Sequence, residues 1–228
     1  MTVTISVDDV EWIQPMTPDE IQALREANQT SSLSFTYGTM FAGKSAMALQ
    51  MANHLEHANI GVLLLTFGDR RGTGVVSSRI GIEMPAYSIT EPHRFSEIRQ
   101  DAIAKGVKVL IVDEAQFATA QQIDELALMV DKYQIDVHCF GLATDFRLQL
   151  FEGSARLFEL ADTIRELPLA AYCWCGKKGK ANARFVNGEI QREGTTKWID
   201  SEDAEGLSYA VLCRYHYLTS RGATYDPR

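Results

Sequence analysis

The sequence predicts an α/β protein in which a mostly parallel sheet is flanked by helices. Apolar strand-like runs alternate with helix-forming segments from residue 33 onward, which is the pattern of a parallel sheet with both faces buried. A glycine-rich loop lies between the first run and the first helical segment, and a later run ends in two acidic residues. Both features are expected at the edge of a parallel sheet where ligands bind.

The expected strands and helices alternate in order along the chain. Four runs rich in branched and aromatic apolar residues are expected to be strands: residues 33–37, 60–66, 107–112 and 135–140. Three connecting segments rich in helix formers are expected to be helices: residues 44–58, 94–104 and 119–132. Parallel strands joined in this way form right-handed crossovers.

Three regions of the chain differ in character. Residues 1–30 read as an N-terminal extension with one helix, which begins at Thr17-Pro18-Asp19-Glu20 because Thr17 caps it and Glu20 completes a capping box. Residues 31–170 carry the alternating pattern of a nucleotide-binding domain. In residues 171–228, cysteines, glycines, lysines and short strand-like pieces replace that pattern, so we expect a small second lobe.

The bulk composition excludes several classes of protein. The 228 residues are 46% hydrophobic and 23% charged, which fits one large globular domain or one domain with a small appendage. A net charge of -8 argues against a nucleic-acid-binding surface, since such a surface is basic. No apolar run has the length of a membrane span, and the N-terminus lacks the features of a signal peptide. We therefore expect a cytoplasmic protein with neither a membrane nor a nucleic-acid partner.

The glycine-rich loop reads G-x-x-x-x-G-K-S, the phosphate-binding P-loop motif. Its residues are Gly38, Thr39, Met40, Phe41, Ala42, Gly43, Lys44 and Ser45. Glycines let the backbone approach phosphate oxygens, and the helix start supplies partial positive charge. Lys44 is expected to reach the β- and γ-phosphates, and the Ser45 hydroxyl to bind Mg2+. The alternative, a glycine turn that only caps a core helix, is disfavoured by the strand before the loop and the helix after it.

An acidic pair follows the run at 107–112. Asp113 is expected at the carboxyl end of that strand, beside the P-loop, where it would hold Mg2+. Glu114 is expected to point elsewhere, because neighbouring side chains at a strand end alternate. A second carboxylate in that position suits a general base. The alternative is an acidic strand end that merely turns into solvent.

Two short segments supply candidate metal ligands. Cys173 and Cys175 form one pair, and Cys213 and His216 form the other. Two such turns closing on one ion make a structural Cys3His zinc site with no open position for catalysis. Cys-x-Cys is tighter than the usual spacing, so unrelated buried thiols beside a surface histidine stay open as an alternative. Cys139 lies inside a strand-like run and is expected to be a core residue.

Together these motifs resemble the type II thymidine kinases, the cytosolic zinc-containing family. The resemblance runs from about residue 33 to residue 217. Residues 38–45 resemble the family's G-x-M-x-[SA]-G-K-[ST], and residues 113–117 resemble its D-E-x-Q-F. Residues 141–147 and 150–154 resemble the segment that leads into the lasso that closes over the nucleoside.

Two further features are similar to the bacterial branch of the family. One is Val-Ser-Ser-Arg-Ile-Gly at residues 76–81, and the other is Cys-x-Cys followed by Cys-x-x-His, where animal enzymes have Cys-x-x-Cys twice. The resemblance implies a RecA-like P-loop kinase domain at 31–170 and a zinc-binding and lasso subdomain at 171–228. It also strengthens the expectation of structural Zn2+ at the four candidate ligands.

The resemblance implies a reaction, the transfer of the ATP γ-phosphoryl group to the 5′-hydroxyl of thymidine or deoxyuridine with Mg2+, in nucleotide salvage. Glu114 matches the family's general base, and Asp69 and Arg70 match an acidic–basic pair at the magnesium and phosphate site. ATP would be bound by the P-loop and by Asp113, Glu114, Ala115 and Gln116. The pyrimidine pocket would be lined by Met40, Phe117, Leu142, Phe146 and Tyr209, for which ordinary core packing is the alternative.

The resemblance also implies properties of the whole protein. The zinc lobe would anchor both ends of the lasso, so that loss of Zn2+ loosens the nucleoside lid. The family forms homotetramers and is inhibited by dTTP, and we expect both here. The extension at residues 1–30 departs from the short N-terminus of the family.

Two other functions stay open on the sequence alone. A P-loop ATPase acting on a nucleic acid or a protein partner would have a similar core, but the acidic charge, the short chain and the lack of an evident arginine-finger segment disfavour it. A catalytically inactive dTTP-binding regulator is disfavoured by the intact Lys44, Asp113 and Glu114.

Overall fold

The computed structural model describes residues 17–19, 31–67, 74–89, 94–168, 171–194 and 206–220. The chain divides into two compact units, Met1–Thr30 and Ser31–Arg228. In the first unit, Pro18 and Asp19 are helical directly after Thr17, where the sequence predicts a helix start. The rest of that predicted helix lies outside the described residues.

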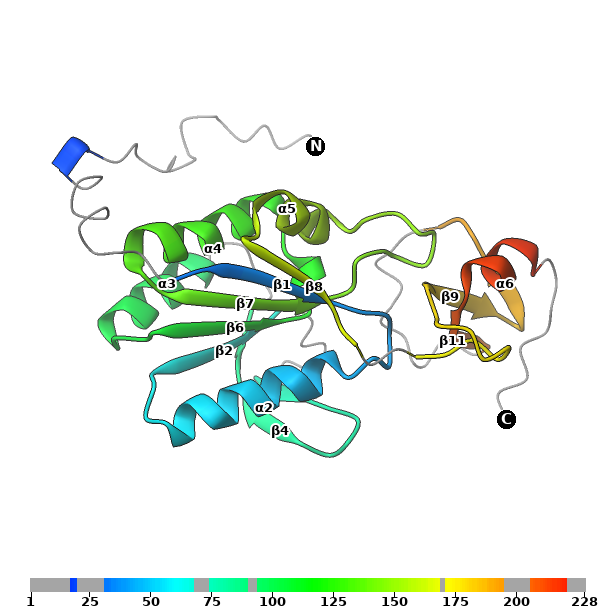
Figure 1. Cartoon of the computed structure of the whole chain (residues 1–228), viewed down its shortest axis with the longest axis horizontal. Coiled ribbons are helices and arrows are strands. Elements are labelled where there is room, and N and C mark those ends of the chain that lie inside the picture. Colours follow the sequence, from blue (N-terminus) through cyan, green and yellow to red (C-terminus); the bar gives the residue numbers. More distant parts are fainter. Residues whose placement is uncertain are drawn as a thin grey trace, which may run out of the picture. The chain divides into compact units, whose positions relative to one another are not determined.

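A six-stranded sheet forms the centre of the second unit (Figure 1). Its strands are β1 (Leu33–Tyr37), β2 (Val62–Thr66), β5 (Tyr87–Ser88), β6 (Val109–Asp113), β7 (Asp136–Gly141) and β8 (Thr163–Glu166). The order is β5-β2-β6-β7-β1-β8, and every neighbouring pair is parallel. The prediction of a mostly parallel sheet is confirmed, and the four predicted strands begin and end within two residues of the observed ones.

Helices cover both faces of this sheet, as Figure 1 shows. On one face, α2 (Lys44–His57) buries Leu49 against Ile111 of β6. Three helices cover the other face: α3 (Arg94–Ala104), α4 (Ala120–Tyr133) and α5 (Glu152–Leu160). Along β6 the side chains alternate, so that Leu110 and Val112 join the core under these three helices. This alternation explains why the strand is apolar throughout.

Local signals define the helix that follows the acidic pair. A 3-10 turn, η2 (Ala115–Phe117), leads from β6 toward α4. Thr119 caps α4, because its hydroxyl accepts from the N–H of Gln122 while the Gln122 side chain accepts from the N–H of Thr119. Such a reciprocal capping box satisfies two backbone donors that a helix start leaves free.

The C-terminal part of the unit has its own sheet. β9 (Ala181–Val186) pairs antiparallel with β10 (Glu189–Gln191) and with β11 (Leu207–Leu212), and α6 (Arg214–Thr219) follows. A core cluster that includes Phe185, Leu212 and Tyr217 lies between these elements. The sheet belongs to the same compact unit as the parallel sheet, and the predicted domain boundary at residue 171 stays a prediction.

A short hairpin, β3 (Val75–Ser77) with β4 (Glu83–Pro85), follows the parallel strand β2. It packs on the same side as α2, since Val76 and Met84 join the cluster around Leu49. Among the helices of the described residues, none has the length and apolar character needed to span a membrane.

Candidate active site

The P-loop turns between β1 and α2. Gly43 precedes α2 with a φ of 84°, a left-handed conformation that glycine adopts without strain. The N–H of Gly38 donates to the carbonyl of Gly141 at 3.2 Å, which ties the start of the loop to the end of β7. A Cβ at Gly38 would lie 3.1 Å from the Cβ of Ala42. The backbone conformation at Gly43 and the close approach at Gly38 therefore favour glycine at both positions of the motif.

The Lys44 ammonium is enclosed by the loop. Its Nζ donates to the carbonyl of Thr39 at 2.9 Å, and the residue is buried. Burial lowers the pKa of Lys44, while the carboxylates of Glu114 and Asp113 raise it. The loop thus places one cation and the N-terminus of α2 at the same point, an arrangement that can bind phosphate.

Asp113 ends β6 and is buried beside the start of α2. It accepts a hydrogen bond from the Ser45 hydroxyl. Burial, followed by the charge of Glu114, raises the pKa of Asp113 to about 7, against the lowering effect of Ser45 and Lys44. Within the described part of the chain, nothing hydrogen bonds its buried Oδ1. A buried carboxylate oxygen without a partner is costly, and a divalent cation would satisfy it.

Glu114 leaves the strand through a turn of its own. Its φ of 54° is a left-handed conformation that is uncommon outside glycine. The side-chain Nε2 of Gln116 donates to Oε2 of Glu114, and the side-chain Oε1 of Gln116 accepts from the N–H of Leu142 at 3.0 Å. Gln116 therefore fixes the Glu114 carboxylate relative to the end of β7.

A cavity of about 320 Å³ opens at this edge of the sheet, a volume in the range of small-molecule sites. Lys44, Ser45 and Glu114 line it, whereas Asp113 does not. The two neighbouring carboxylates therefore face different surroundings. The five predicted pyrimidine-pocket residues all line this cavity: Met40, Phe117, Leu142, Phe146 and Tyr209.

The C-terminal sheet contributes to the same cavity through Asn182 and Tyr209. Asn182 is buried on β9, and its Oδ1 accepts from the N–H of Met40 at 2.7 Å. Its Nδ2 donates to the carbonyl of Thr144 at 3.4 Å. The P-loop, the segment after β7 and the C-terminal sheet are joined by this single side chain.

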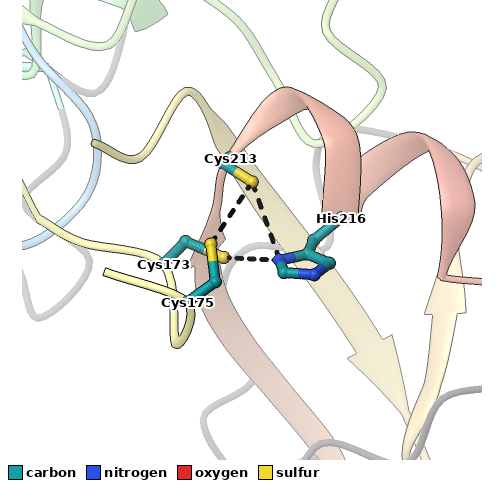
Figure 2. A group of neighbouring side chains, drawn as sticks. All are labelled: Cys173, Cys175, Cys213 and His216. Atoms are coloured by element: carbon teal, nitrogen blue, oxygen red, sulfur yellow. Dashed lines mark hydrogen bonds between the residues drawn. The ribbon is translucent and has the colours of Figure 1, made fainter. Parts of the chain in front are cut away.

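The four candidate metal ligands converge (Figure 2). Their ligand atoms all lie within 4.8 Å of one another, with the Cys175 and Cys213 sulfurs 3.9 Å apart and Cys173 Sγ 3.2 Å from His216 Nδ1. A tetrahedral zinc with Zn–S bonds of about 2.3 Å needs sulfurs about 3.8 Å apart. The backbone N–H of His216 lowers the pKa of the Cys213 thiol, which favours the thiolate that a metal binds. The cluster fits a structural metal ion.

A family model of thymidine kinases matches residues 31–217. The chain belongs to the thymidine kinase family. Curated thymidine kinases of bacteria agree: that of Streptomyces avermitilis is 43% identical, covering 84% of this chain and 92% of its own length. Those of Cutibacterium acnes and Haemophilus influenzae are 41% and 40% identical, over 82% and 84% of this chain and 88% and 98% of their own lengths.

Solved structures resemble this chain only in part. The Pif1 helicase from Candida albicans aligns with 67% of this chain and 39% of its own length, at 15% identity and a TM-score of 0.39. That likeness is too low to carry an argument about function.

Several residues of the predicted ATP site do not line the cavity. Among the described residues, Gly38, Thr39 and Ala42 frame the loop instead, and Ala115 is fully buried. Asp69 and Arg70 lie outside the described residues, so their place at the site stays a prediction. Cys139 is fully buried in β7, and its prediction as a core residue is confirmed.

The structure adds cavity residues that sequence reasoning missed. The hairpin turn lines the cavity with residues 77–80, and the Arg79 guanidinium lies 4.0 Å from the centroid of the Phe41 ring. A signal for it existed, because residues 76–81 match a family motif. Asn182 had no such signal, since it comes from another sheet and its partner Met40 is far away in sequence.

Proposed function

We propose that this chain transfers the γ-phosphoryl group of ATP to the 5′-hydroxyl of thymidine, and also accepts deoxyuridine. Membership of the thymidine kinase family supports the reaction class. The observation that carries the proposal is one cavity lined by the P-loop lysine, the Glu114 carboxylate and five apolar or aromatic side chains. Such a cavity can hold a phosphate donor and, against its apolar side chains, the flat face of a pyrimidine base.

The residues can divide the work of phosphoryl transfer among them. Lys44 and the P-loop N–H groups would hold the phosphates and balance charge that develops on the transferred group. Glu114 would accept the proton of the 5′-hydroxyl as that oxygen attacks phosphorus, because its carboxylate opens into the cavity. Gln116 would hold this carboxylate in position through its bond to Leu142.

Mg2+ is the proposed companion of ATP. The unpartnered Oδ1 of Asp113 and the Ser45 hydroxyl beside it fit a hard cation with oxygen ligands. A bound Mg2+ would neutralise charge on the phosphate oxygens. Asp69 and Arg70 are proposed to assist at the same place, on the family match alone.

Structural Zn2+ is the proposed occupant of the cysteine–histidine cluster. Four ligands fill a tetrahedral shell, so the ion would have no position left for substrate. Its role would be to hold Cys173 and Cys175 against α6 and thereby, as the family resemblance implies, anchor the two ends of the lasso. The family resemblance adds dTTP as feedback inhibitor and a homotetramer. The net charge of -8 supports the absence of a nucleic-acid partner, and a cytoplasmic location is part of the same proposal.

A panel of nucleosides tests the proposal. ATP consumption would be followed with thymidine, deoxyuridine, deoxycytidine, deoxyguanosine, single-stranded DNA or no acceptor. We expect turnover only with thymidine and deoxyuridine. Turnover that ignores nucleosides and rises with DNA would support the P-loop ATPase, and tight dTTP binding without turnover would support a regulator.

A further inference from the structure

One hydrogen bond links the metal-ligand helix to the cavity. Tyr217 follows His216 on α6, and its hydroxyl donates to the backbone carbonyl of Phe146 at 2.8 Å. Both residues are only 3% exposed. Phe146 lines the cavity. This buried hydrogen bond therefore joins Tyr217, the neighbour of a candidate metal ligand, to the cavity wall.

Two arginines hold this contact from either side. The Arg184 guanidinium lies 3.7 Å from the centroid of the Phe146 ring, and its Nη2 donates to the carbonyl of Glu193 at 3.2 Å. The Arg192 guanidinium lies 4.8 Å from the centroid of the Tyr217 ring. Stacked guanidinium groups restrict both rings, so neither can move independently of the C-terminal sheet.

The cavity side of the contact is also fixed. Asp145 Oδ1 accepts from the backbone N–H groups of Arg147 at 2.8 Å and Gln149 at 3.0 Å. Asp145 Oδ2 pairs with the Arg147 guanidinium at 2.6 Å, and this carboxylate is almost fully buried. The segment that carries Phe146 is thus a braced turn, which moves as a body when its contact with Tyr217 moves.

We propose that Tyr217 is a positioning residue that couples metal binding at the cysteine–histidine cluster to nucleoside binding in the cavity, through its hydrogen bond to Phe146. The proposal rests on the proposed function, because it takes thymidine as the ligand of the cavity. The metal fixes Cys213 and His216, these fix the first turn of α6, and Tyr217 transmits that position to the Phe146 backbone.

Such a coupling is reciprocal, since each ligand must change the affinity of the other by the same factor. If metal binding favours the nucleoside-binding position of Phe146, thymidine must tighten metal binding. A purely structural role for Tyr217 would leave the effect of thymidine on zinc affinity the same in wild type and in Tyr217→Phe. This reciprocity gives a readout that does not depend on catalysis.

The test compares the wild-type chain with Tyr217→Phe. Tyr215→Phe is the matched control, because it removes the same hydroxyl from the same helix at an exposed position. The Kd for zinc would be measured by competition with a metallochromic chelator, with and without saturating thymidine. We expect thymidine to tighten zinc binding about three- to tenfold in wild type and Tyr215→Phe, and less than twofold in Tyr217→Phe.

Steady-state kinetics supply a second readout. Tyr217→Phe should raise the KM for thymidine about three- to tenfold and leave the KM for ATP within twofold, because the Tyr217 hydroxyl bonds to Phe146 and not, among the described residues, to the P-loop. Arg184→Lys removes the planar group over Phe146 and should also weaken the coupling. It serves as the second variant if Tyr217→Phe folds poorly.

The outcomes separate two failures. Equal coupling in wild type and Tyr217→Phe, or a wild-type zinc affinity that thymidine does not change, would overturn the role of Tyr217 and leave the proposed function standing. Calorimetry that finds no thymidine binding to the wild-type chain would overturn the proposed function and this inference with it.

Discussion

At the scale of single residues, two adjacent carboxylates, Asp113 and Glu114, lie in different surroundings. Asp113 ends a strand and is buried against Ser45, whereas Glu114 adopts a left-handed backbone and lines the cavity. Backbone conformation thus separates the proposed metal-binding position from the proposed base position one residue away. A residue in a strained conformation is often kept for function, which is how we interpret Glu114.

Replacing Glu114 by Gln removes the proposed proton acceptor and keeps the side-chain volume. We expect kcat to fall by about a hundredfold or more, with ATP affinity within a few-fold of wild type. Exposed Glu97 on α3 provides the control, and Glu97→Gln should be unchanged. Near-normal turnover of Glu114→Gln would remove Glu114 from the base role.

The raised pKa of Asp113 predicts a pH-dependent stability. The folded, nucleotide-free chain binds the Asp113 proton more tightly than the unfolded chain, since the pKa is raised from 3.8 to about 7. The contribution of this group to the free energy of unfolding therefore falls as pH rises between these values. Asn is neutral throughout, so Asp113→Asn should stabilise the nucleotide-free protein, by about 1–3 kcal/mol more at pH 8 than at pH 5.

Denaturant unfolding at the two pH values measures this difference. Exposed Asp101 pairs with Lys105 at the surface, and Asp101→Asn should show almost no pH-dependent gain. A gain for Asp113→Asn that is equal at pH 5 and pH 8 would contradict the assigned pKa. The same variant should lose Mg2+-dependent turnover.

Elements differ in how well the sequence predicts them. Central strands such as β6 are uniformly apolar and were predicted, because burial on both faces leaves a clear pattern. β5 has two residues and β8 reads Thr-Ile-Arg-Glu at a sheet edge, so neither carries that pattern. α5 was missed because Gly153 and Ser154 in its first turn are weak helix formers.

The site shows the same division. The P-loop, the acidic pair and the metal ligands follow local spacing, so the sequence places them in advance. Asn182 and Tyr217 act through contacts with Met40 and Phe146, far away in the chain. Only the placement of the C-terminal sheet and α6 beside the P-loop and the segment after β7 brings them there, and no local pattern in the sequence indicates it.

The docking of α5 on η2 depends on one glycine. A Cβ at Gly153 would lie 2.6 Å from the carbonyl oxygen of Ala115 and 2.7 Å from that of Ala118. Backbone atoms cannot yield easily, so Gly153→Ala should destabilise the fold by about 1–3 kcal/mol. Glu159→Ala on the same helix removes an exposed ion pair and should cost less than about 1 kcal/mol. Thermal unfolding of the two variants decides, and equal losses would contradict the close docking.

At the scale of the whole molecule, the C-terminal sheet lines part of the cavity with Asn182 and Tyr209. The candidate metal ligands flank this sheet in the chain, before β9 and directly after β11. We expect about one zinc ion per chain by elemental analysis. Cys213→Ser should lower the zinc content and weaken thymidine binding more than ATP binding, because the P-loop directly connects β1 and α2 of the parallel-sheet part. Cys139→Ala, which removes a thiol from the core, should keep its zinc. A metal-free wild-type chain with reduced thiols and full thymidine affinity would contradict the structural role of the metal.

The proposed reaction is tested by incubating the chain with thymidine and ATP labelled in the γ-phosphate. Transfer of the label to thymidine 5′-monophosphate, in wild type and not in Glu114→Gln, is the result expected from one cavity that holds both substrates. Label released as inorganic phosphate at the same rate with and without thymidine would contradict it.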